Sequence, residues 1–259
     1  MHTPRGPRDI SRRTALRLGA AVAASIPLLG ASAFDALWQE PARLKARPGD
    51  PTLTAFAGRQ QITTDGAQAL AWVPEKVKRD VASPLVMFLH GALRRPEIYL
   101  EQHVSVADET GTIVLAPYST VGTWDAIRGS FGRDIAVLDA SLRWVFARWR
   151  IDPKRIVLSG FSDGGTYALS VGIANGDFFT RIAAWSPGFI IPTKAVGRPP
   201  VLISHGTEDQ ILPIDQTSRQ IVPALKAAGY TVDYREFKGP HAIQKPILEE
   251  MIRELATRR

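Results

Sequence analysis

The chain has 259 residues, of which 45% are hydrophobic and 22% are charged, a composition typical of globular domains. It contains no cysteine, which excludes disulfides, thiolate metal sites, cysteine nucleophiles and a lipid anchor on an N-terminal cysteine. Residues 1–33 carry +4 of the formal charge of +7, which leaves +3 for the remaining residues, too little for a surface that binds nucleic acid.

The first 33 residues are predicted to be an export signal. A basic stretch with the adjacent Arg12 and Arg13 precedes a weakly apolar run over residues 18–29, and small residues end at Ala33. The paired arginines resemble bacterial twin-arginine signals, which implies export of a folded protein to the periplasm or the medium. The apolar run is shorter than the ~20 residues that span a bilayer. We therefore expect cleavage after Ala33 and no stable membrane anchor, with a mitochondrial-type presequence or a chance basic terminus as alternatives.

Residues 34–259 are predicted to form a single domain with alternating strands and helices. No internal repeat and no linker divides them. Several of the apolar runs are continuous, which is typical of strands buried on both faces of a parallel sheet. The segments before residue 69 could add an antiparallel hairpin at one edge. The predicted strands are Ala69–Val73, Leu85–Leu89, Thr112–Ala116, Arg155–Ser159, Arg181–Trp185, Val201–Ser204 and Thr231–Phe237.

Helical periodicity lies between these runs. Apolar residues recur at helical spacing over residues 135–149, and further helices are predicted over residues 166–174, 216–228 and 243–256. Alternating strands and helices predict a mostly parallel sheet with helices on both faces. In such sheets, functional sites form at the carboxyl ends of the strands.

One five-residue pattern, Gly160-Phe161-Ser162-Asp163-Gly164, points to chemistry because it matches G-x-S-x-G. It follows an apolar run directly and opens a helical stretch, which is the setting of a nucleophile elbow. The turn leaves no room for side chains at the two glycines and lifts the serine hydroxyl to a helix N-terminus. Ser162 is therefore predicted to be a nucleophile, and an incidental serine in a glycine-rich turn is the alternative.

A serine hydroxyl needs a general base. With this kind of elbow, an acid and then a histidine follow the serine along the chain, which leaves His205 and His241. His241 is predicted to be the base because it leaves room for an acid in the loop after residue 204, and His205 is the alternative. The other histidines precede Ser162 and are assigned elsewhere: His2 to the leader, His90 to bracing its loop and His103 to the surface.

The acid that orients the imidazole is expected in the loop after the strand of residues 201–204. Glu208 and Asp209 both lie there, whereas Asp215 is expected at a helix N-terminus. The oxyanion of the reaction needs backbone N–H donors, for which we predict the amides of Asp163 and Ala92.

Together these motifs resemble the α/β-hydrolase superfamily, and more narrowly the bacterial phospholipase/carboxylesterase and polyhydroxybutyrate-depolymerase-like esterases. The resemblance covers residues 84–259 and rests on residues 88–91, 160–165, 205–213 and 239–241. The third segment is similar to the family pattern H-G-x-x-D-x-x-[VIL]-P, whose aspartate is the triad acid. The resemblance therefore implies an α/β-hydrolase fold and a triad of Ser162, Asp209 and His241.

Two features depart from the family pattern. Leu93-Arg94-Arg95-Pro96 stands where these esterases usually have further glycines, and Pro240 replaces the usual glycine before His241. The link over residues 186–200 is too short for a cap domain, so an open, shallow site is expected. Six residues are predicted to line an acyl or alcohol pocket, with ordinary packing as the alternative for the aromatic ones: Gly91, Tyr118, Trp124, Asp125, Trp185 and Phe189.

The expected function is an exported serine hydrolase that cleaves small or medium carboxylic esters through an acyl-Ser162 intermediate. No metal is expected, because the sequence has no H-x-H or H-E-x-x-H spacing, and no other cofactor is expected. Thioesterase, phospholipase or lysophospholipase, polyester depolymerase and peptidase activities use the same triad and stay open as alternatives. A non-catalytic binding protein is disfavoured because all three triad residues are present.

Overall fold

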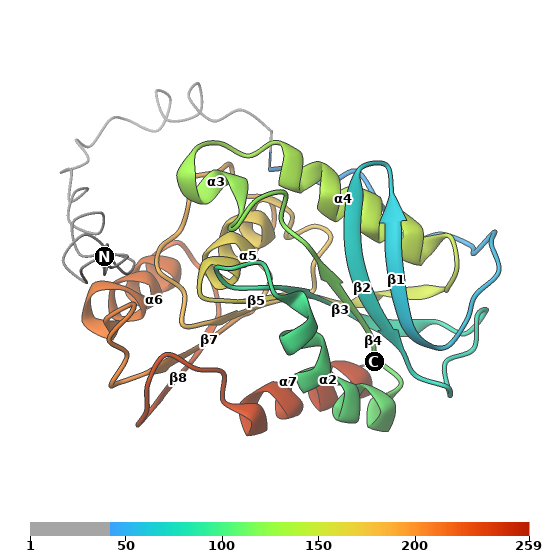
Figure 1. Ribbon diagram of the computed structural model, residues 1–259. Helices are drawn as coiled ribbons and strands as arrows, with labels where there is room; N and C mark the ends of the chain where they lie inside the picture. Colours follow the sequence, from blue (N-terminus) through green and yellow to red (C-terminus); the bar gives the residue numbers. More distant parts are fainter. Residues whose placement is uncertain (1–41, 259) are drawn as a thin grey trace, which may run out of the picture. The chain divides into compact units, whose positions relative to one another are not determined.

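The computed structural model describes residues 42–258 of the chain. Within them, an eight-stranded sheet forms the centre of the fold (Figure 1). Its order is β1-β2-β4-β3-β5-β6-β7-β8; β1, β2 and β4 pair antiparallel, and all other neighbours pair parallel. The mostly parallel sheet with an antiparallel edge hairpin is confirmed, while the predicted export signal lies outside the described residues. The strands are β1 Gly58–Thr64, β2 Ala67–Val73, β3 Ser83–Leu89, β4 Ile113–Pro117, β5 Ile151–Phe161, β6 Arg181–Trp185, β7 Val201–Gly206 and β8 Val232–Phe237.

The central strands are apolar throughout because both faces of the sheet are covered. Every residue of β3 is buried. Successive side chains point to opposite faces, so Leu85 and Met87 join one hydrophobic cluster while Val86 and Phe88 join another. The continuous apolar run that predicted a doubly covered strand thus reflects two separate cores.

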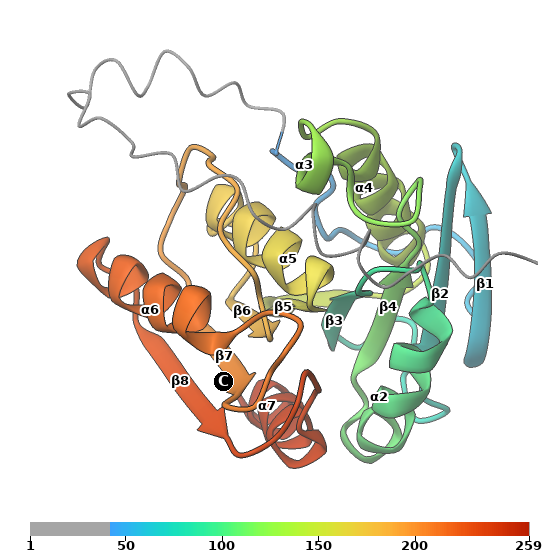
Figure 2. The same cartoon turned by 60° about the vertical axis from the view of Figure 1, so that its left-hand side comes forward.

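Helices form a layer on each face of the sheet, as Figures 1 and 2 show. Helices α2 and α7 pack against one face, where their apolar side chains meet Val86, Phe88 and Val157. The other helices cover the opposite face. None of the helices within residues 42–258 is long and apolar enough to cross a lipid bilayer. The helices are α2 Pro96–Thr110, α3 Asp125–Arg128, α4 Arg133–Phe146, α5 Asp163–Ala174, α6 Ser218–Ala227 and α7 Lys245–Thr257, with a 3₁₀ turn η2 over Ile214–Gln216.

Residues 186–200 join β6 to β7 without a helix or strand. The predicted absence of a large cap after β6 therefore agrees with the fold of this segment. The loops that follow β3, β4, β5, β7 and β8 all lie at one edge of the sheet, where the parallel strands have their carboxyl ends.

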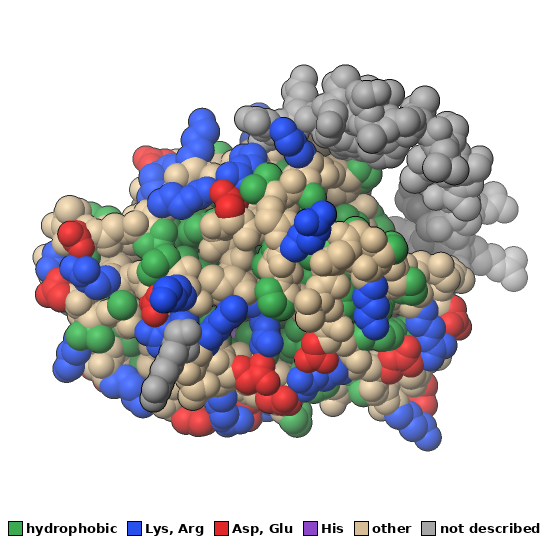
Figure 3. Space-filling model, turned by 180° about the vertical axis from the view of Figure 1, so that it is seen from behind, with side chains coloured by type: hydrophobic (Ala, Val, Ile, Leu, Met, Phe, Trp, Pro, Cys, Tyr) green, Lys and Arg blue, Asp and Glu red, His purple; other side chains and the backbone are tan. Residues whose placement is uncertain are grey.

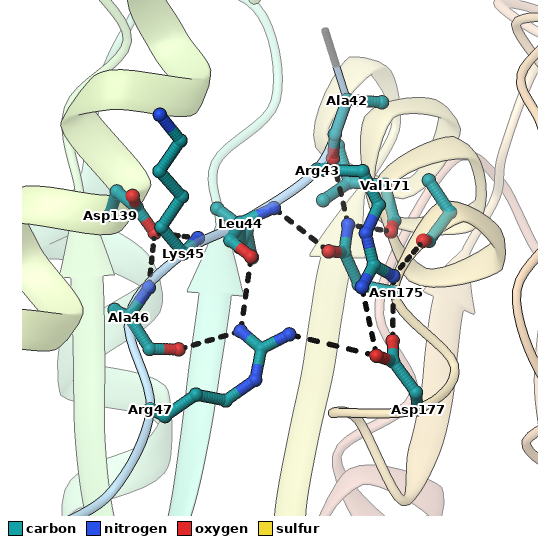
Figure 4. A network of polar contacts seen from close by, with 11 residues as sticks. Ala42, Arg43, Leu44, Lys45, Ala46, Arg47, Asp139, Val171, Asn175 and Asp177 are labelled. Carbon is teal, nitrogen blue, oxygen red and sulfur yellow. Dashed lines mark hydrogen bonds and ion pairs between the residues drawn. The ribbon is translucent and has the colours of Figure 1, made fainter. Parts of the chain in front are cut away.

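An extended segment of residues 42–47 ties α4 to α5 (Figure 4). The buried side chain of Asn175 accepts from the Leu44 amide at 2.8 Å and donates to the Ala42 carbonyl at 2.7 Å. Asp139 on α4 accepts from two successive backbone amides of the segment, at 2.8 and 2.9 Å. This segment therefore has its backbone groups satisfied by two helices that are distant from it in sequence.

The prediction that His103 lies on the surface is wrong. Its side chain is fully buried on α2, and its ring contacts Phe88 edge-on with centroids 4.7 Å apart. Nδ1 donates to the Tyr99 carbonyl at 2.6 Å, while Nε2 is buried without a partner among the described residues. Burial lowers the pKa of His103 to about 4, so the ring is neutral and packs as an aromatic residue.

Charged side chains of both signs share the surface. Figure 3 shows basic and acidic groups intermixed on the face opposite to that of Figure 1. Many of them pair, as Arg253 does with Glu109 at 2.7 Å and Arg219 with Glu236 at 2.7 Å. These exposed pairs contribute little to stability individually.

Candidate active site

The turn between β5 and α5 holds Ser162 in a left-handed backbone conformation, with φ 56° and ψ −119°. Glycines make this turn possible, because a Cβ on Gly160 would lie 2.1 Å from the carbonyl oxygen of Gly164, and a Cβ on Gly164 would lie 2.1 Å from that of Leu89. The Ser162 amide donates to the Trp185 carbonyl of the neighbouring β6 at 2.8 Å. The strand–turn–helix setting that the sequence predicted is present.

Asp209 and His241 meet at the ends of the neighbouring strands β7 and β8. The Nδ1 atom of His241 lies 2.6 Å from Oδ2 of Asp209. The other carboxylate oxygen accepts from the backbone amides of Ile211 and Leu212 at 2.9 and 2.8 Å. The carboxylate is thus oriented from both sides, and Nε2 is left as the imidazole nitrogen that could exchange a proton.

The exposure of the two acidic candidates separates them. Asp209 is buried and hydrogen-bonded, whereas Glu208 is exposed and uses its backbone amide to donate to the Gly239 carbonyl. Burial raises the pKa of Asp209, but the Leu212 amide and the hydrogen bond and charge of His241 outweigh it, so the net pKa is lowered. Asp209 is therefore ionised at neutral pH.

A second histidine touches the same carboxylate. His205 has no accessible surface, and its Nε2 lies 3.0 Å from Oδ2 of Asp209 and 2.9 Å from the Leu212 carbonyl. Its Nδ1 lies 2.6 Å from Oγ of Ser218. Because Nε2 faces two acceptors, it carries the proton, and Nδ1 accepts from the Ser218 hydroxyl. Burial lowers the pKa of His205, which keeps the ring neutral.

His205 was predicted only as an alternative general base. Both of its nitrogens are engaged with protein groups, so neither is available to a serine hydroxyl. Its contact with Asp209 was missed, although the spacing of four residues in His205-Gly206-Thr207-Glu208-Asp209 was a signal that could have found it.

Phe161 connects the neighbourhoods of Ser162 and His241. The His241 ring packs on the Phe161 ring with centroids 4.6 Å apart, and Phe161 directly precedes the serine. Within residues 42–258, neither the Ser162 hydroxyl nor Nε2 of His241 makes a hydrogen bond. Catalytic hydrogen bonds are often long in unliganded proteins and tighten with substrate. The pairing of Ser162 with His241 stays a prediction.

The loop after β3 lies against the elbow. A Cβ added to Gly91 would lie 3.4 Å from the Phe161 carbonyl oxygen. His90 is fully buried; its Nε2 accepts from the Ser119 amide at 3.0 Å, so Nδ1 carries the proton and donates to the Gly91 carbonyl at 2.6 Å. His90 therefore braces this loop, as its position predicted.

The segment after β4 is fastened to the same place. Thr123 donates to the side chain of Asp163 at 2.5 Å, and the indole of Trp124 donates to the His90 carbonyl at 2.8 Å. The Asp163 amide opens α5, where the first N–H groups have no partner within the helix. Ala92 lies exposed in the adjoining loop. Their proposed role as oxyanion donors stays a prediction.

Three of the six predicted pocket residues make structural contacts. Trp124 and Trp185 have no accessible surface; Trp124 stacks between His90 and Tyr167, and Trp185 donates to Ser159 at 2.9 Å. The carboxylate of Asp125 accepts from Tyr167, Ala126 and Asp134, which holds the loop before α4. The prediction that Trp124 and Trp185 line a pocket is therefore wrong, while that of the half-buried Asp125 stays a prediction.

The remaining pocket candidates lie nearer to solvent. Phe189 is exposed, Tyr118 is half-buried with its hydroxyl donating to Glu97, and Gly91 lies beside the elbow. Exposed large apolar side chains occur in the loops after four strands that end at this edge, and all of them except Phe189 were missed from the sequence: Leu93, Val121, Phe189 and Ile211. We call these four residues the apolar rim.

No three histidine, aspartate or glutamate side chains within residues 42–258 gather in a way that could hold a metal ion. The chemistry available to the described site is that of its serine, histidine and aspartate side chains and its backbone amides.

A family model described as phospholipase/carboxylesterase matches residues 130–258. Among solved structures, the fold is similar to that of the fluorophosphonate-binding serine hydrolase F of Staphylococcus aureus. The TM-score is 0.62 at 15% identity, and the alignment covers 80% of this chain and all of that one. A likeness at this identity shows the fold alone.

Two curated proteins are similar in sequence. A bifunctional acetylxylan esterase/xylanase of Neocallimastix patriciarum is 34% identical over 145 residues, which is 52% of this chain and 20% of that protein. Acyl-protein thioesterase 1 of Gibberella zeae is 33% identical over 98 residues, which is 34% of this chain and 41% of that protein. The chain thus spans less than half the length of either relative.

Proposed function

We propose that this chain, whose sheet and helices have the α/β-hydrolase fold, hydrolyses carboxylic esters through an acyl intermediate on Ser162. The observation that carries the proposal is the 2.6 Å contact between Asp209 and His241 beside a serine held in a nucleophile elbow. A buried, ionised aspartate on Nδ1 leaves Nε2 of the same ring free to act as general base.

The proposed reaction has two acyl-transfer steps. Ser162 attacks the ester carbonyl carbon while His241 takes the hydroxyl proton, and the carbonyl oxygen becomes an oxyanion beside the amides of Ala92 and Asp163. The tetrahedral intermediate collapses, the C–O bond to the alcohol breaks, and His241 returns the proton to the leaving alkoxide. Water then attacks the acyl-serine with the same histidine as base, which releases the acid and restores Ser162.

The apolar rim supports esters with small or medium apolar groups. Leu93, Val121, Phe189 and Ile211 expose between 48% and 81% of their surface around the carboxyl edge of the sheet. Exposed apolar clusters next to a polar site favour contact with apolar ligands. The missing cap leaves this rim without a cover in the described residues.

The test is hydrolysis of p-nitrophenyl acetate and butyrate by the wild type and by Ser162→Ala. We expect the variant to lose at least 10³-fold in kcat/KM, because no other group supplies the covalent intermediate. A fluorophosphonate probe should label Ser162 in the wild type and leave the variant unlabelled. A folded Ser162→Ala variant that keeps its activity would refute the proposal.

A thioester is the second candidate substrate, favoured by the similarity to an acyl-protein thioesterase. The triad chemistry is the same for both leaving groups, so the distinction lies in kcat/KM for matched pairs. Butyryl esters and butyryl thioesters of the same alcohol skeleton provide this comparison, with acetylated xylan as a third arm that the other curated relative suggests.

We also propose, from residues 1–33 alone, that the protein is exported by a twin-arginine route. Replacing Arg12 and Arg13 with lysine should retain the protein in the producing cell. Secreted material whose N-terminal sequence begins at Met1 would contradict cleavage after Ala33.

A further inference from the structure

A cavity of about 250 Å³ lies beside the β1–β2 hairpin, at the same edge of the sheet where the parallel strand β5 ends next to Ser162. It lies where β4 ends and β2 begins, since Pro117 pairs with Ala69. Polar groups line much of it, and a smaller cavity next to it shares Gln68 and Tyr118. The reaction proposed above uses none of these side chains. The polar residues come from β2 and from the segments after β3 and β4: Gln68, Arg94, Tyr118, Ser119 and Thr120.

The backbone that carries Arg94 into this cavity is strained. Leu93 and Arg94 both have positive φ, 75° and 53°, a region where a Cβ is unfavourable and glycine is not. The Leu93 amide donates to the Gly122 carbonyl at 2.9 Å, which holds the strained turn. Strain of this kind persists where the side chains it presents serve a function.

Arg94 places a positive charge in the wall of this cavity, and part of its guanidinium has no hydrogen-bond acceptor among the described residues. Its Nη2 donates to Oε1 of Gln68 at 3.0 Å, and its guanidinium lies over the Tyr118 ring, 5.2 Å from the centroid. Nε is buried without a partner, and Arg94 forms no ion pair with any residue in 42–258. The nearby Glu97 carboxylate is engaged by the Tyr118 hydroxyl instead. A half-buried cation held in this way favours an anionic partner.

We propose that Arg94 binds a carboxylate carried by the ester substrate, so that the preferred substrates are esters with a second, free acid group. The inference rests on the proposed ester hydrolysis and names the class of ester. A planar guanidinium suits a carboxylate because its N–H groups can donate to both oxygens. Gln68 and Tyr118 hold the guanidinium in place before the substrate arrives.

The position of Arg94 in the chain favours substrates in which only a few atoms separate the ester group from the free carboxylate. Two peptide units separate it from Ala92, so their Cα atoms are at most about 7 Å apart. Gly91 in turn contacts the elbow residue Phe161. The loop that carries Arg94 thus leads to the elbow within a few residues, and the length of diacid that spans Ser162 and Arg94 is the quantity that the experiment determines.

The experiment compares monomethyl and dimethyl esters of linear diacids from succinate to suberate, with rates followed by titration of the released acid. We expect the wild type to hydrolyse the monoester with a KM about tenfold lower than that of the diester at one or two chain lengths. The preference should weaken in high salt because it is electrostatic. Equal KM values at every length would overturn the proposal.

Two variants and one matched control assign the effect to Arg94. Arg94→Gly removes the charge and relieves the positive φ, so it should unfold at the same or a higher temperature while the preference disappears. Arg94→Gln should lose the preference as well. Arg95→Gln removes the same charge from an exposed neighbour and should keep the preference. A preference that survives in Arg94→Gly, or that is lost equally in Arg95→Gln, would overturn the proposal.

Failure of this inference is distinguishable from failure of the proposed function. If the wild type hydrolyses p-nitrophenyl butyrate and its Ser162 is labelled by the probe, but no monoester is preferred, only the carboxylate site is refuted. If neither hydrolysis nor labelling occurs, the ester hydrolase proposal itself fails.

Discussion

Replacing His205 with alanine is expected to slow ester hydrolysis, although this side chain is completely buried and does not contact the substrate. Its Nε2 proton lies between Oδ2 of Asp209 and the Leu212 carbonyl, at 3.0 and 2.9 Å. We infer that His205 is a positioning residue, which holds the aspartate that in turn orients His241. The substitution removes one donor from a carboxylate whose direction decides where the general base points.

The hydrogen bonds of the carboxylate set the size of the effect. Asp209 accepts from His241, His205, Ile211 and Leu212, which uses all the positions that two carboxylate oxygens offer. A hydrogen bond to a charged group contributes about 1.5–3 kcal/mol, and here the proton is shared with a carbonyl, so the lower half applies. At about 1.4 kcal/mol per factor of ten, kcat/KM should fall about 10- to 40-fold if the whole effect reaches the transition state.

His205→Gln is the rescue variant, because its amide can place an N–H donor near the position of Nε2. It should recover most of the activity that His205→Ala loses on p-nitrophenyl butyrate, with urea unfolding used to verify that both variants fold. His103→Gln serves as the matched control, since His103 is equally buried but contacts Phe88 and Tyr99 on α2. Wild-type kcat/KM in a folded His205→Ala variant, or no recovery in His205→Gln, would refute the reasoning.

Two further predictions concern stability. Burial lowers the pKa of His103 to about 4, so the unfolded chain takes up this proton first and the fold loses stability as the pH falls from about 6.5 to about 4. At about 1.4 kcal/mol per tenfold change in proton affinity, the loss is about 3 kcal/mol, and His103→Phe should remove it; urea unfolding at pH 7 and pH 4.5 that shows the same pH dependence in both proteins would contradict this. Asn175→Ala should lower the free energy of unfolding by about 2–4 kcal/mol, because the Leu44 amide and the Ala42 carbonyl lose their buried partner. Asp177→Asn, which weakens an exposed ion pair to Arg43, is the control and should cost less than about 1 kcal/mol; equal losses in the two variants would contradict the role of Asn175.

The central strands could be predicted because burial on both faces leaves a pattern that few other structures produce. Strand β6 has the predicted bounds, Arg181–Trp185, and four of its five residues are buried. The elbow was equally readable, because Gly160 and Gly164 are required by backbone atoms about 2 Å from where a side chain would begin. In both cases the residues that show the constraint, the apolar run of a buried strand or the two glycines of the turn, are close together in the sequence.

Burial of polar residues could not be predicted in the same way. The buried face of α2 contains Leu100, His103 and Val106 at helical spacing, yet a histidine in a polar stretch suggests a surface position. The ring is buried because it can stay neutral and pack against Phe88. The outcome depends on the sheet residue that it meets, which is distant in sequence.

The prediction that Trp124 and Trp185 line a pocket failed for a related reason. Trp185 ends β6 and Trp124 lies in the loop after β4, positions from which side chains often reach a ligand, but each indole turns inward and donates a hydrogen bond. Whether a loop folds back over its own side chains depends on partners such as His90 and Tyr167, and local composition does not encode this. Phe189 is also an aromatic residue that follows a strand of this edge, so the same prediction applies to it, yet its side chain is exposed.

The pairing of Asp209 with His241 depends on a glycine that carries no chemistry. Gly206 ends β7 opposite Phe237 of β8, and a Cβ there would lie 2.3 Å from the carbonyl oxygen of Gly239. The missing side chain lets the two loops touch backbone to backbone, and Thr207 and Glu208 donate across this contact to the carbonyls of Phe237 and Gly239. The next residue of one loop is Asp209, and His241 follows two positions after Gly239 in the other. The motif H-G-x-x-D therefore contains both contacts that position Asp209: the histidine that holds its carboxylate and the glycine that brings His241, the proposed general base, within 2.6 Å.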